Sequence, residues 1–133
     1  MVRLQFTIKG EPVAKGRPVI TTIGGYARTY TPKKTRDAEN NMRAQIVQQL
    51  PEGFAPLLTP LHVHIYITRG KPKSARKKDI YPVKKPDLDN HIKSVLDAMN
   101  TVVFRDDSQI IRLFAEKSFG VPEVKIDVEE VEA

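Results

Sequence analysis

Lys85-Pro86-Asp87-Leu88-Asp89-Asn90-His91-Ile92-Lys93 marks the point where extended chain is expected to give way to helix. Pro86 disfavours helix at the residue before it, so the chain should arrive extended and begin a helix near Asp87. A helically spaced apolar series then continues through Leu88, Ile92, Val95, Leu96, Met99 and Val103. The sequence therefore predicts an amphipathic helix over about residues 88–103.

A basic segment, residues 69–85, leads into this helix. It holds eight lysine and arginine residues, with Asp79 alone on the acidic side. Gly70, Pro72 and Pro82 oppose regular structure, so we expect a basic loop. Such charge runs are usually just solvated, but this one runs directly into an acidic motif. Its candidate DNA-binding residues are Lys73, Arg76, Lys77, Lys78, Lys84 and Lys85.

Alternating apolar residues predict strands on both sides of this region. Residues 61–67 put Leu61, Val63, Ile65 and Ile67 on one face, as expected of a central strand. Its other face carries His62 and His64, which we interpret as surface or interface histidines because no third ligand lies in the strand. The other expected strands are residues 2–8, 109–119 and 124–131, with a hairpin formed by 19–23 and 26–30 around Gly24-Gly25.

A first helix is expected between the hairpin and the central strand. Thr31 followed by Pro32 predicts its start, with the hydroxyl as cap and proline at the first helical position. The helix should run to about Leu50 and stop at Pro51. Its apolar stripe is Ala38, Met42, Ile46 and Leu50. The predicted fold is α+β, one domain over residues 1–133 with two amphipathic helices.

Charge and composition narrow the function. The 133-residue chain has a net charge of +6, and its acidic end, residues 123–133, holds five acidic residues against Lys125 alone. The remaining chain is therefore strongly basic and suits a polyanion, nucleic acid first and an anionic membrane surface second, although solubility alone is an equal explanation. The chain lacks cysteine, which excludes disulfides and thiolate sites. Without a leader or a long apolar run, we expect a cytoplasmic protein with no membrane partner.

The candidate metal ligands are carboxylates around the second helix. Asp87 and Asp89, two apart on extended chain, can point the same way, and Lys93 lies one turn beyond Asp89. A third acidic element, Asp106-Asp107, is expected where the helix gives way to a strand. Magnesium prefers such oxygen ligands. The plainer alternative is that Asp87 or Asp89 caps the helix and that Asp106-Asp107-Ser108 is an ordinary polar turn.

These segments closely resemble the signature of the RusA family of Holliday junction resolvases. The matching segments are residues 85–90 (KPDLDN), Lys93, residues 96–100 (LDAMN) and residues 106–110 (DDSQI). Residues 10–18 and 27–32 look like the amino-terminal portion of the phage-type branch of that family. Val19 departs from this branch, which commonly has another arginine there, so a DNA contact is not carried over to it.

The resemblance implies a mixed sheet carrying two helices and a magnesium- or manganese-dependent endodeoxyribonuclease. By position, Asp87, Asp89 and Asp107 would bind the ion, and Lys93 would be the catalytic lysine. The candidate supporting residues around this set are Asn90, Asp97 and Asp106. Lys15 and Arg17 would add to the phosphate contacts of the basic loop.

The implied activity is symmetric resolution of four-way junctions in DNA recombination and repair. A four-way junction has an approximate two-fold axis and needs two opposed cuts, so a homodimer with one site per subunit fits the task. Two other interpretations remain open at this point. The chain could be a branched-DNA-binding module without catalysis, or a nuclease that acts on flaps or single strands.

Overall fold

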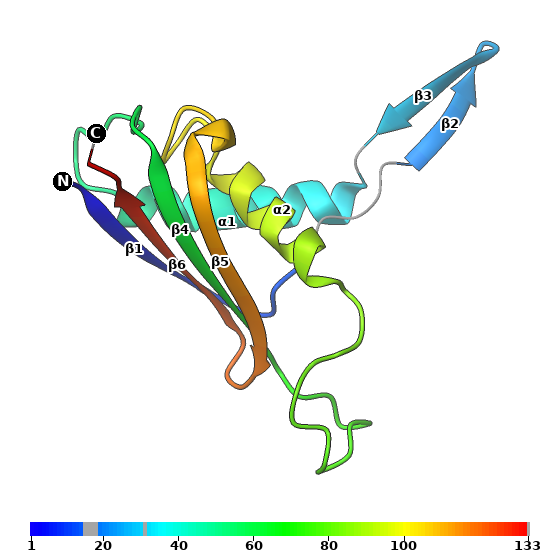
Figure 1. Ribbon diagram of the computed structural model, residues 1–133. Helices are drawn as coiled ribbons and strands as arrows, with labels where there is room; N and C mark the ends of the chain where they lie inside the picture. The colour runs from blue at the N-terminus through cyan, green and yellow to red at the C-terminus, as the bar shows by residue number, and fades with distance from the viewer. Residues whose placement is uncertain (15–18, 31, 133) are drawn as a thin grey trace.

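The structure is a computed structural model that describes residues 1–14, 19–30 and 32–132. The elements, in chain order, are β1 (Arg3–Lys9), β2 (Val19–Ile23), β3 (Tyr26–Tyr30), α1 (Lys33–Gln49), β4 (Leu61–Arg69), α2 (Leu88–Met99), the 3-10 turn η1 (Asp107–Gln109), β5 (Ile110–Phe119) and β6 (Glu123–Glu130). Figure 1 shows the sheet with both helices beside it. The α+β fold class predicted from the sequence is confirmed.

The main sheet has four strands in the order β1-β6-β4-β5. β4 pairs parallel with β5, while the β1–β6 and β4–β6 pairs are antiparallel, so the sheet is mixed. The expected central strand is β4, which has a partner on each side. Its alternation is visible in the burial: residues at odd positions from Leu61 to Ile67 are buried, and those between them are half-buried.

The parallel pair β4–β5 is connected by the basic loop and α2. A helix that joins two parallel strands must run back against them, from the end of the first strand to the start of the second. Figure 1 shows α2 in this antiparallel course beside β5. The first turn of α2 therefore lies at the carboxyl ends of β4 and β5, and its last turn lies at their amino ends.

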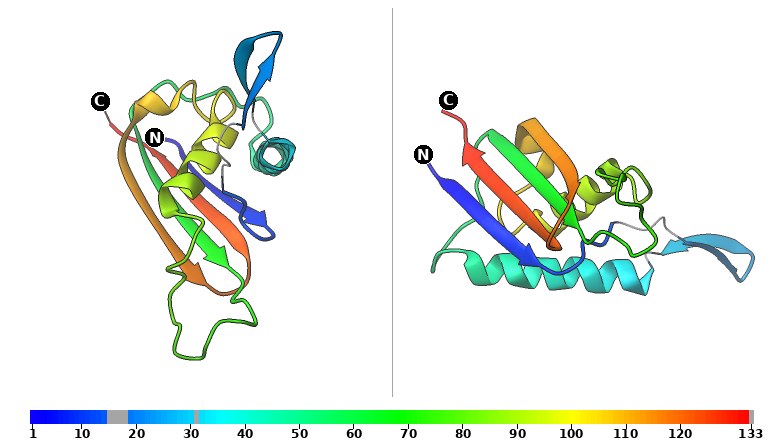
Figure 2. Two further views of the ribbon diagram at one scale, coloured as in Figure 1. Left: turned by 90° about the vertical axis from the view of Figure 1, so that its right-hand side faces the viewer. Right: turned by 90° about the horizontal axis from the view of Figure 1, so that it is seen from below.

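Both helices cover the same face of the sheet, as Figure 2 shows from two further directions. The core is formed where α1 and α2 meet that face. Its fully enclosed side chains are Phe104, Ile46, Leu61, Ile65, Ile67, Met99, Ile126, His91, Val63, Val95, Val103 and Val124. The opposite face of the sheet carries no helix from the described part of the chain.

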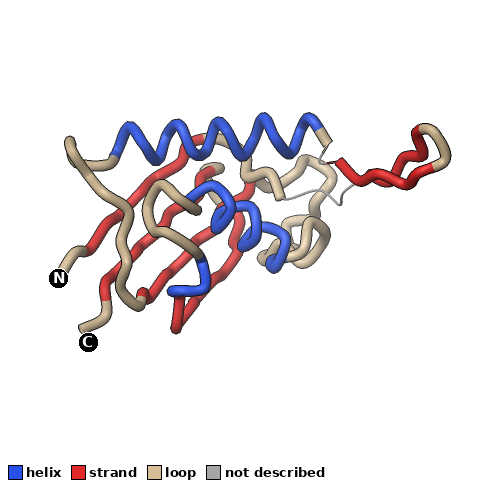
Figure 3. Tube along the Cα trace, turned by 90° about the horizontal axis from the view of Figure 1, so that it is seen from above, coloured by secondary structure: helices blue, strands red, loops and turns tan. Residues whose placement is uncertain are grey.

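β2 and β3 form a separate two-stranded antiparallel sheet, turning at Gly24-Gly25. Both glycines have positive φ, 59° and 82°, which suits a tight hairpin turn. The hairpin extends beyond the amino-terminal end of α1, away from the main sheet (Figure 3). The predicted hairpin is confirmed with the same bounds.

Helix α1 begins one residue later than predicted. Pro32 is the N-cap, with φ −54° and ψ 144°, and its extended ψ places it outside the helix. Its carbonyl accepts the backbone N–H of Arg36 at 3.1 Å, which closes the first helical turn. Thr31, the predicted cap, lies outside the described residues.

Helix α2 ends at Met99, four residues earlier than its apolar pattern suggested. Thr101 adopts φ 68°, a left-handed conformation that ends the helix in a turn. The backbone N–H of Val103 still bonds to the carbonyl of Met99 at 2.9 Å, so the turn folds back under the helix. Val103 is therefore buried as the pattern required, but from a turn, and its neighbour Phe104 is buried with it.

Candidate active site

Two exposed carboxylates open helix α2. Asp87 is its N-cap residue in extended conformation, with φ −68° and ψ 151°, but its side chain makes no capping hydrogen bond. Asp89 lies in the first turn and is also exposed. Within residues 1–14, 19–30 and 32–132, neither carboxylate has a hydrogen bond or an ion pair. The helix-cap alternative is therefore not realised by the Asp87 side chain.

Three of the predicted residues fall on one line along α2. Asp89, Lys93 and Asp97 are spaced by four residues, so each lies about one turn beyond the last on the same side. Lys93 is exposed, whereas Asp97 is half-buried. The backbone carbonyl of Asp97 accepts the Nη2 of Arg43 at 2.7 Å, which ties this turn of α2 to α1.

Two cations from the sheet fix the chain just ahead of Asp87. The Nζ of Lys117 on β5 donates to the carbonyl oxygens of Lys84 and Pro86, at 3.1 Å each. The Nη1 of Arg69, at the end of β4, donates to the carbonyl of Lys85 at 3.2 Å. Three successive carbonyls are thus held by side chains of the sheet, and we call this arrangement the carbonyl clamp.

His91 lies beneath the same end of α2. Only 1% of the residue is exposed, and its Nε2 has no hydrogen-bond partner among the described residues. Burial is the main cause that lowers the pKa of His91 to about 4, and the positive charges of Arg69 and Lys117 contribute in the same direction. The imidazole is therefore neutral near pH 7 and adds no charge beneath the two carboxylates.

Asp106 and Asp107 occupy different roles in η1. Asp106 is the N-cap, and its carboxylate accepts the backbone N–H of Ser108 at 2.9 Å in a capping box completed by Gln109. Hydrogen bonds from Ser108, first from its side chain and then from its backbone, lower the pKa of Asp106. Asp107 is half-buried in the same turn, and no described residue hydrogen-bonds to its carboxylate. Asp106 therefore caps this turn, in line with the polar-turn alternative, and the metal role of Asp107 stays a prediction.

The structure does not bring Asp107 to the other two aspartates. Twelve helical residues separate the two ends of α2, a length of about 18 Å. The contacts agree, because Lys117 reaches Pro86 near the end of β5, whereas η1 precedes the start of that strand. Among the described residues, no group of three or more potential ligands is placed to hold a metal ion. Of the three predicted metal ligands, only Asp87 and Asp89 lie at the same end of α2.

The basic loop is a loop in the structure, and its candidate DNA contacts are exposed. The exposed residues are Lys73, Arg76, Lys77, Lys78, Lys84 and Lys85. Its internal contacts are local: Asp79 forms an ion pair with Arg76 at 3.7 Å and accepts the backbone N–H of Arg76 at 2.9 Å, and the Lys71 ammonium donates to the carbonyl of Lys77 at 3.4 Å. Lys15 and Arg17 lie outside the described residues, and the segment before them passes α2, where Ser94 donates to the carbonyl of Val13 at 3.0 Å.

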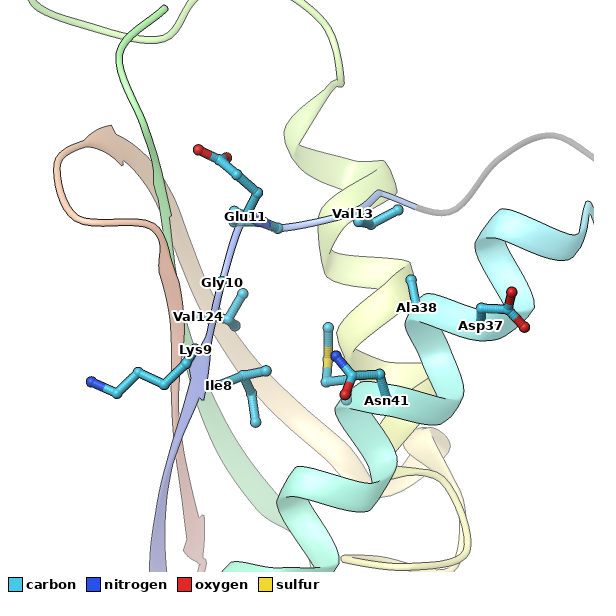
Figure 4. Close-up of a pocket in the computed structure, with 11 residues that line it drawn as sticks. Ile8, Lys9, Gly10, Glu11, Val13, Asp37, Ala38, Asn41 and Val124 are labelled. Atoms are coloured by element: carbon cyan, nitrogen blue, oxygen red, sulfur yellow. The ribbon is translucent and has the colours of Figure 1, made fainter.

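Two other features contain none of the predicted metal ligands. His62 and His64 project from the uncovered face of the sheet, where the His64 ring packs against Phe114 with centroids 5.7 Å apart. A hollow of about 280 Å³ lies between the end of β1 and α1. Figure 4 shows the Glu11 and Asp37 carboxylates on opposite sides of it. None of the predicted metal ligands lines this hollow.

Sequence analysis missed the carbonyl clamp. Lys117 falls in the alternating series Leu113, Ala115, Lys117, whose members are paired with the buried side of β4. A lysine at an inward position is a detectable signal, because such a charge needs partners inside the protein. Without the register of β5 against β4, the inward side of the series could not be identified.

Asp87 and Asp89, without partners in the described ranges, lie beside a basic loop, which combines possible metal ligands with a surface suited to nucleic acid. Neither described helix has the length and apolar character needed to cross a bilayer. Residues 9–129 match the family model for endodeoxyribonuclease RusA. The chain is also 32% identical to the uncharacterized protein YqaN of Bacillus subtilis (strain 168), over 98% of each chain. It belongs to the RusA family of endodeoxyribonucleases.

Proposed function

We propose that this endodeoxyribonuclease depends on magnesium or manganese and resolves four-way DNA junctions by symmetric cleavage. The observation that carries the proposal is the pair of carboxylates at the start of α2, exposed and unpaired within the described ranges, directly after the basic loop. In a DNA-binding module without catalysis, such carboxylates would only repel phosphate. A bound cation would turn that repulsion into attraction.

Asp87 and Asp89 suit a magnesium ion. Magnesium in phosphoryl-transfer sites is commonly held by one or two carboxylates, with waters and substrate phosphate completing its octahedron. When bound, the ion would supply an activated water and stabilise charge on the phosphate. The ammonium of Lys93, one turn along α2, is available to a phosphate oxygen or to the leaving oxygen. The carbonyl clamp fixes the backbone from which Asp87 projects.

The basic loop would position the DNA arms by contacts to phosphates, which do not read sequence. A homodimer would present two such sites to the two opposed strands of a junction. Lys15 and Arg17 would extend the phosphate-binding surface on the approach to β2.

The direct test is incubation of the protein with a mobile four-way junction, a flap and a linear duplex, with magnesium and with EDTA. The proposal expects paired symmetric nicks in the junction with magnesium, and binding without cleavage in EDTA. Equal cleavage of linear duplex would contradict junction resolution. Preference for the flap would identify a flap nuclease, and binding without cleavage in any divalent cation would identify a binding module.

Charge reversal in the basic loop tests DNA binding. Changing Lys73, Lys77 and Lys78 to glutamate should weaken junction binding and flatten its salt dependence, since fewer counterions are released. Loss of about three phosphate contacts should reduce the slope of log K against log salt by about 2 to 3. The matched control reverses Lys33 and Lys34 at the start of α1. An unchanged slope in the loop variant would remove this loop from the interface.

Lys117→Met tests the carbonyl clamp. The substitution keeps the aliphatic length and removes the ammonium that holds two carbonyls. We expect cleavage to fall by about 10- to 100-fold and the magnesium concentration for half-maximal rate to rise, because Asp87 loses its fixed backbone. Lys117→Arg should recover part of the rate. Lys125→Met, on the exposed side of β6, is the control, and an equal loss there would point to general damage.

A further inference from the structure

The basic loop leaves β4 through a residue that has no room for a side chain. A Cβ on Gly70 would lie 2.5 Å from Glu11 Oε1 and 3.4 Å from the Cγ of Pro122. Gly70 does not have a positive φ, so its backbone conformation is open to other residues. The close approach of the Glu11 carboxylate is therefore what favours glycine at the start of the loop.

Glu11 holds the start of the loop through a backbone hydrogen bond. Its Oε1 accepts the N–H of Gly70 at 2.9 Å. Hydrogen bonds to an ionised acceptor are stronger than those between neutral groups. One residue earlier, the carbonyl of Arg69 accepts the N–H of Gly120, in the turn between β5 and β6, at 2.9 Å. The point where the loop leaves the sheet is thus tied to two other segments of the chain.

The far end of the loop is fixed at the same place. The Nη1 of Arg69 donates to the carbonyl of Lys85 across 16 positions of sequence, at 3.2 Å. Just beyond Gly70, the Nζ of Lys71 lies 5.9 Å from the centroid of the Phe119 ring. Figure 1 shows the loop projecting from this point, past the ends of β4 and β5. We call Glu11, Arg69, Gly70 and Lys85 the loop neck.

We propose that Glu11 is a positioning residue for DNA. Its carboxylate fixes the direction in which the basic loop leaves the sheet, and that direction makes the protein prefer branched over linear DNA. This inference rests on the proposed function, in which the loop contacts the phosphates of the junction arms. A loop that already points along one arm binds it with little loss of conformational freedom. A linear duplex offers phosphates along a single axis, which a mobile loop can follow from many starting directions.

The charge of Glu11 and its hydrogen bond have opposite expected effects on DNA binding. A carboxylate beside a phosphate-binding loop lowers the local positive potential. Removal of the charge alone should therefore strengthen binding to any DNA. Loss of the hydrogen bond should instead weaken binding to the junction in particular, because the loop must then be ordered when the DNA binds.

Four variants separate the hydrogen bond from the charge. Glu11→Ala removes both, and Glu11→Gln removes the charge but keeps an acceptor oxygen. Gly70→Ala keeps the charge and displaces the carboxylate from the N–H. Asp37→Ala is the matched control, since it removes a carboxylate from the opposite side of the hollow that Glu11 lines (Figure 4). The dissociation constants of a four-way junction and of a linear duplex are measured in EDTA at one salt concentration.

The expected result is a change of selectivity. Glu11→Ala and Gly70→Ala should each lower the preference for the junction over the duplex by about three- to tenfold. The double variant should lose no more than either single variant, because both substitutions remove the same hydrogen bond. Glu11→Gln and Asp37→Ala should keep the preference within about twofold of the wild type. Single-turnover cleavage at saturating junction should also stay within about twofold, since Asp87 and Asp89 are unaltered.

Equal losses of junction and duplex affinity would show that Glu11 only supports the fold, and would overturn the inference. An unchanged preference in Glu11→Ala, additive losses in the double variant, or an equal loss in Glu11→Gln would overturn it too, as would a wild type with no preference for the junction. A wild type that prefers the junction but does not cut it contradicts the proposed function instead. The binding ratios then still decide the role of Glu11.

Discussion

Asp107→Asn is expected to lower junction cleavage by more than about a hundredfold while junction binding persists or tightens. Asparagine keeps the shape of the side chain but removes the charge that would hold the cation. Binding should not weaken, because loss of a carboxylate relieves repulsion of phosphate. Single-turnover cleavage with magnesium and gel-shift titration in EDTA measure the two effects separately.

The matched control is Asp106→Asn. Asp106 caps η1 through the N–H of Ser108, and asparagine is as good an N-cap as aspartate. This variant should therefore retain most of the cleavage activity and nearly all of the stability. The reverse order, with Asp106→Asn inactive and Asp107→Asn active, would show that the third ligand is misassigned, although the nuclease proposal would survive.

Phe104→Ala should reduce the free energy of unfolding by about 3–5 kcal/mol. The side chain is 0% exposed and occupies the core from the turn that follows α2. Truncation leaves a cavity that the surrounding strands and helix cannot fill. Urea unfolding followed by circular dichroism measures the change.

The control for this variant is Leu58→Ala, in the neighbouring loop. Leu58 is 70% exposed, so its loss should change the free energy of unfolding by no more than about 0.5 kcal/mol. A loss below about 1 kcal/mol for Phe104→Ala would mean that the turn after α2 does not anchor the core.

Local patterns predicted most of the elements. The hairpin bounds are correct because two glycines separate two β-prone runs, and β4 follows from strict apolar alternation. The end of α2 was predicted too late because buried side chains continue at helical spacing into a turn. The helix stops because the backbone leaves the helical conformation at Asn100, with ψ 133°, and turns left-handed at Thr101.

The candidate site was less accessible to sequence reasoning. Asp87, Asp89 and Lys93 are neighbours on one helix, so their proximity follows from spacing alone. The place of Asp107 depends on the parallel pairing of β4 with β5, which sends α2 back along the sheet. Strand order and direction are long-range properties that one sequence does not display. The carbonyl clamp depends on the same register.

The carbonyl clamp separates two parts of the chain that should differ in local stability. The basic loop has local turn hydrogen bonds but no strand partner in the described chain, so its amides should exchange with solvent after local opening alone. Beyond the clamp, Asp87 is fastened to β4 and β5, and the amides of the central strand β4 should exchange only with global opening. The loop can therefore change conformation around a bulky polyanion. The three anchored carbonyls should keep this movement from displacing the two carboxylates at the start of α2.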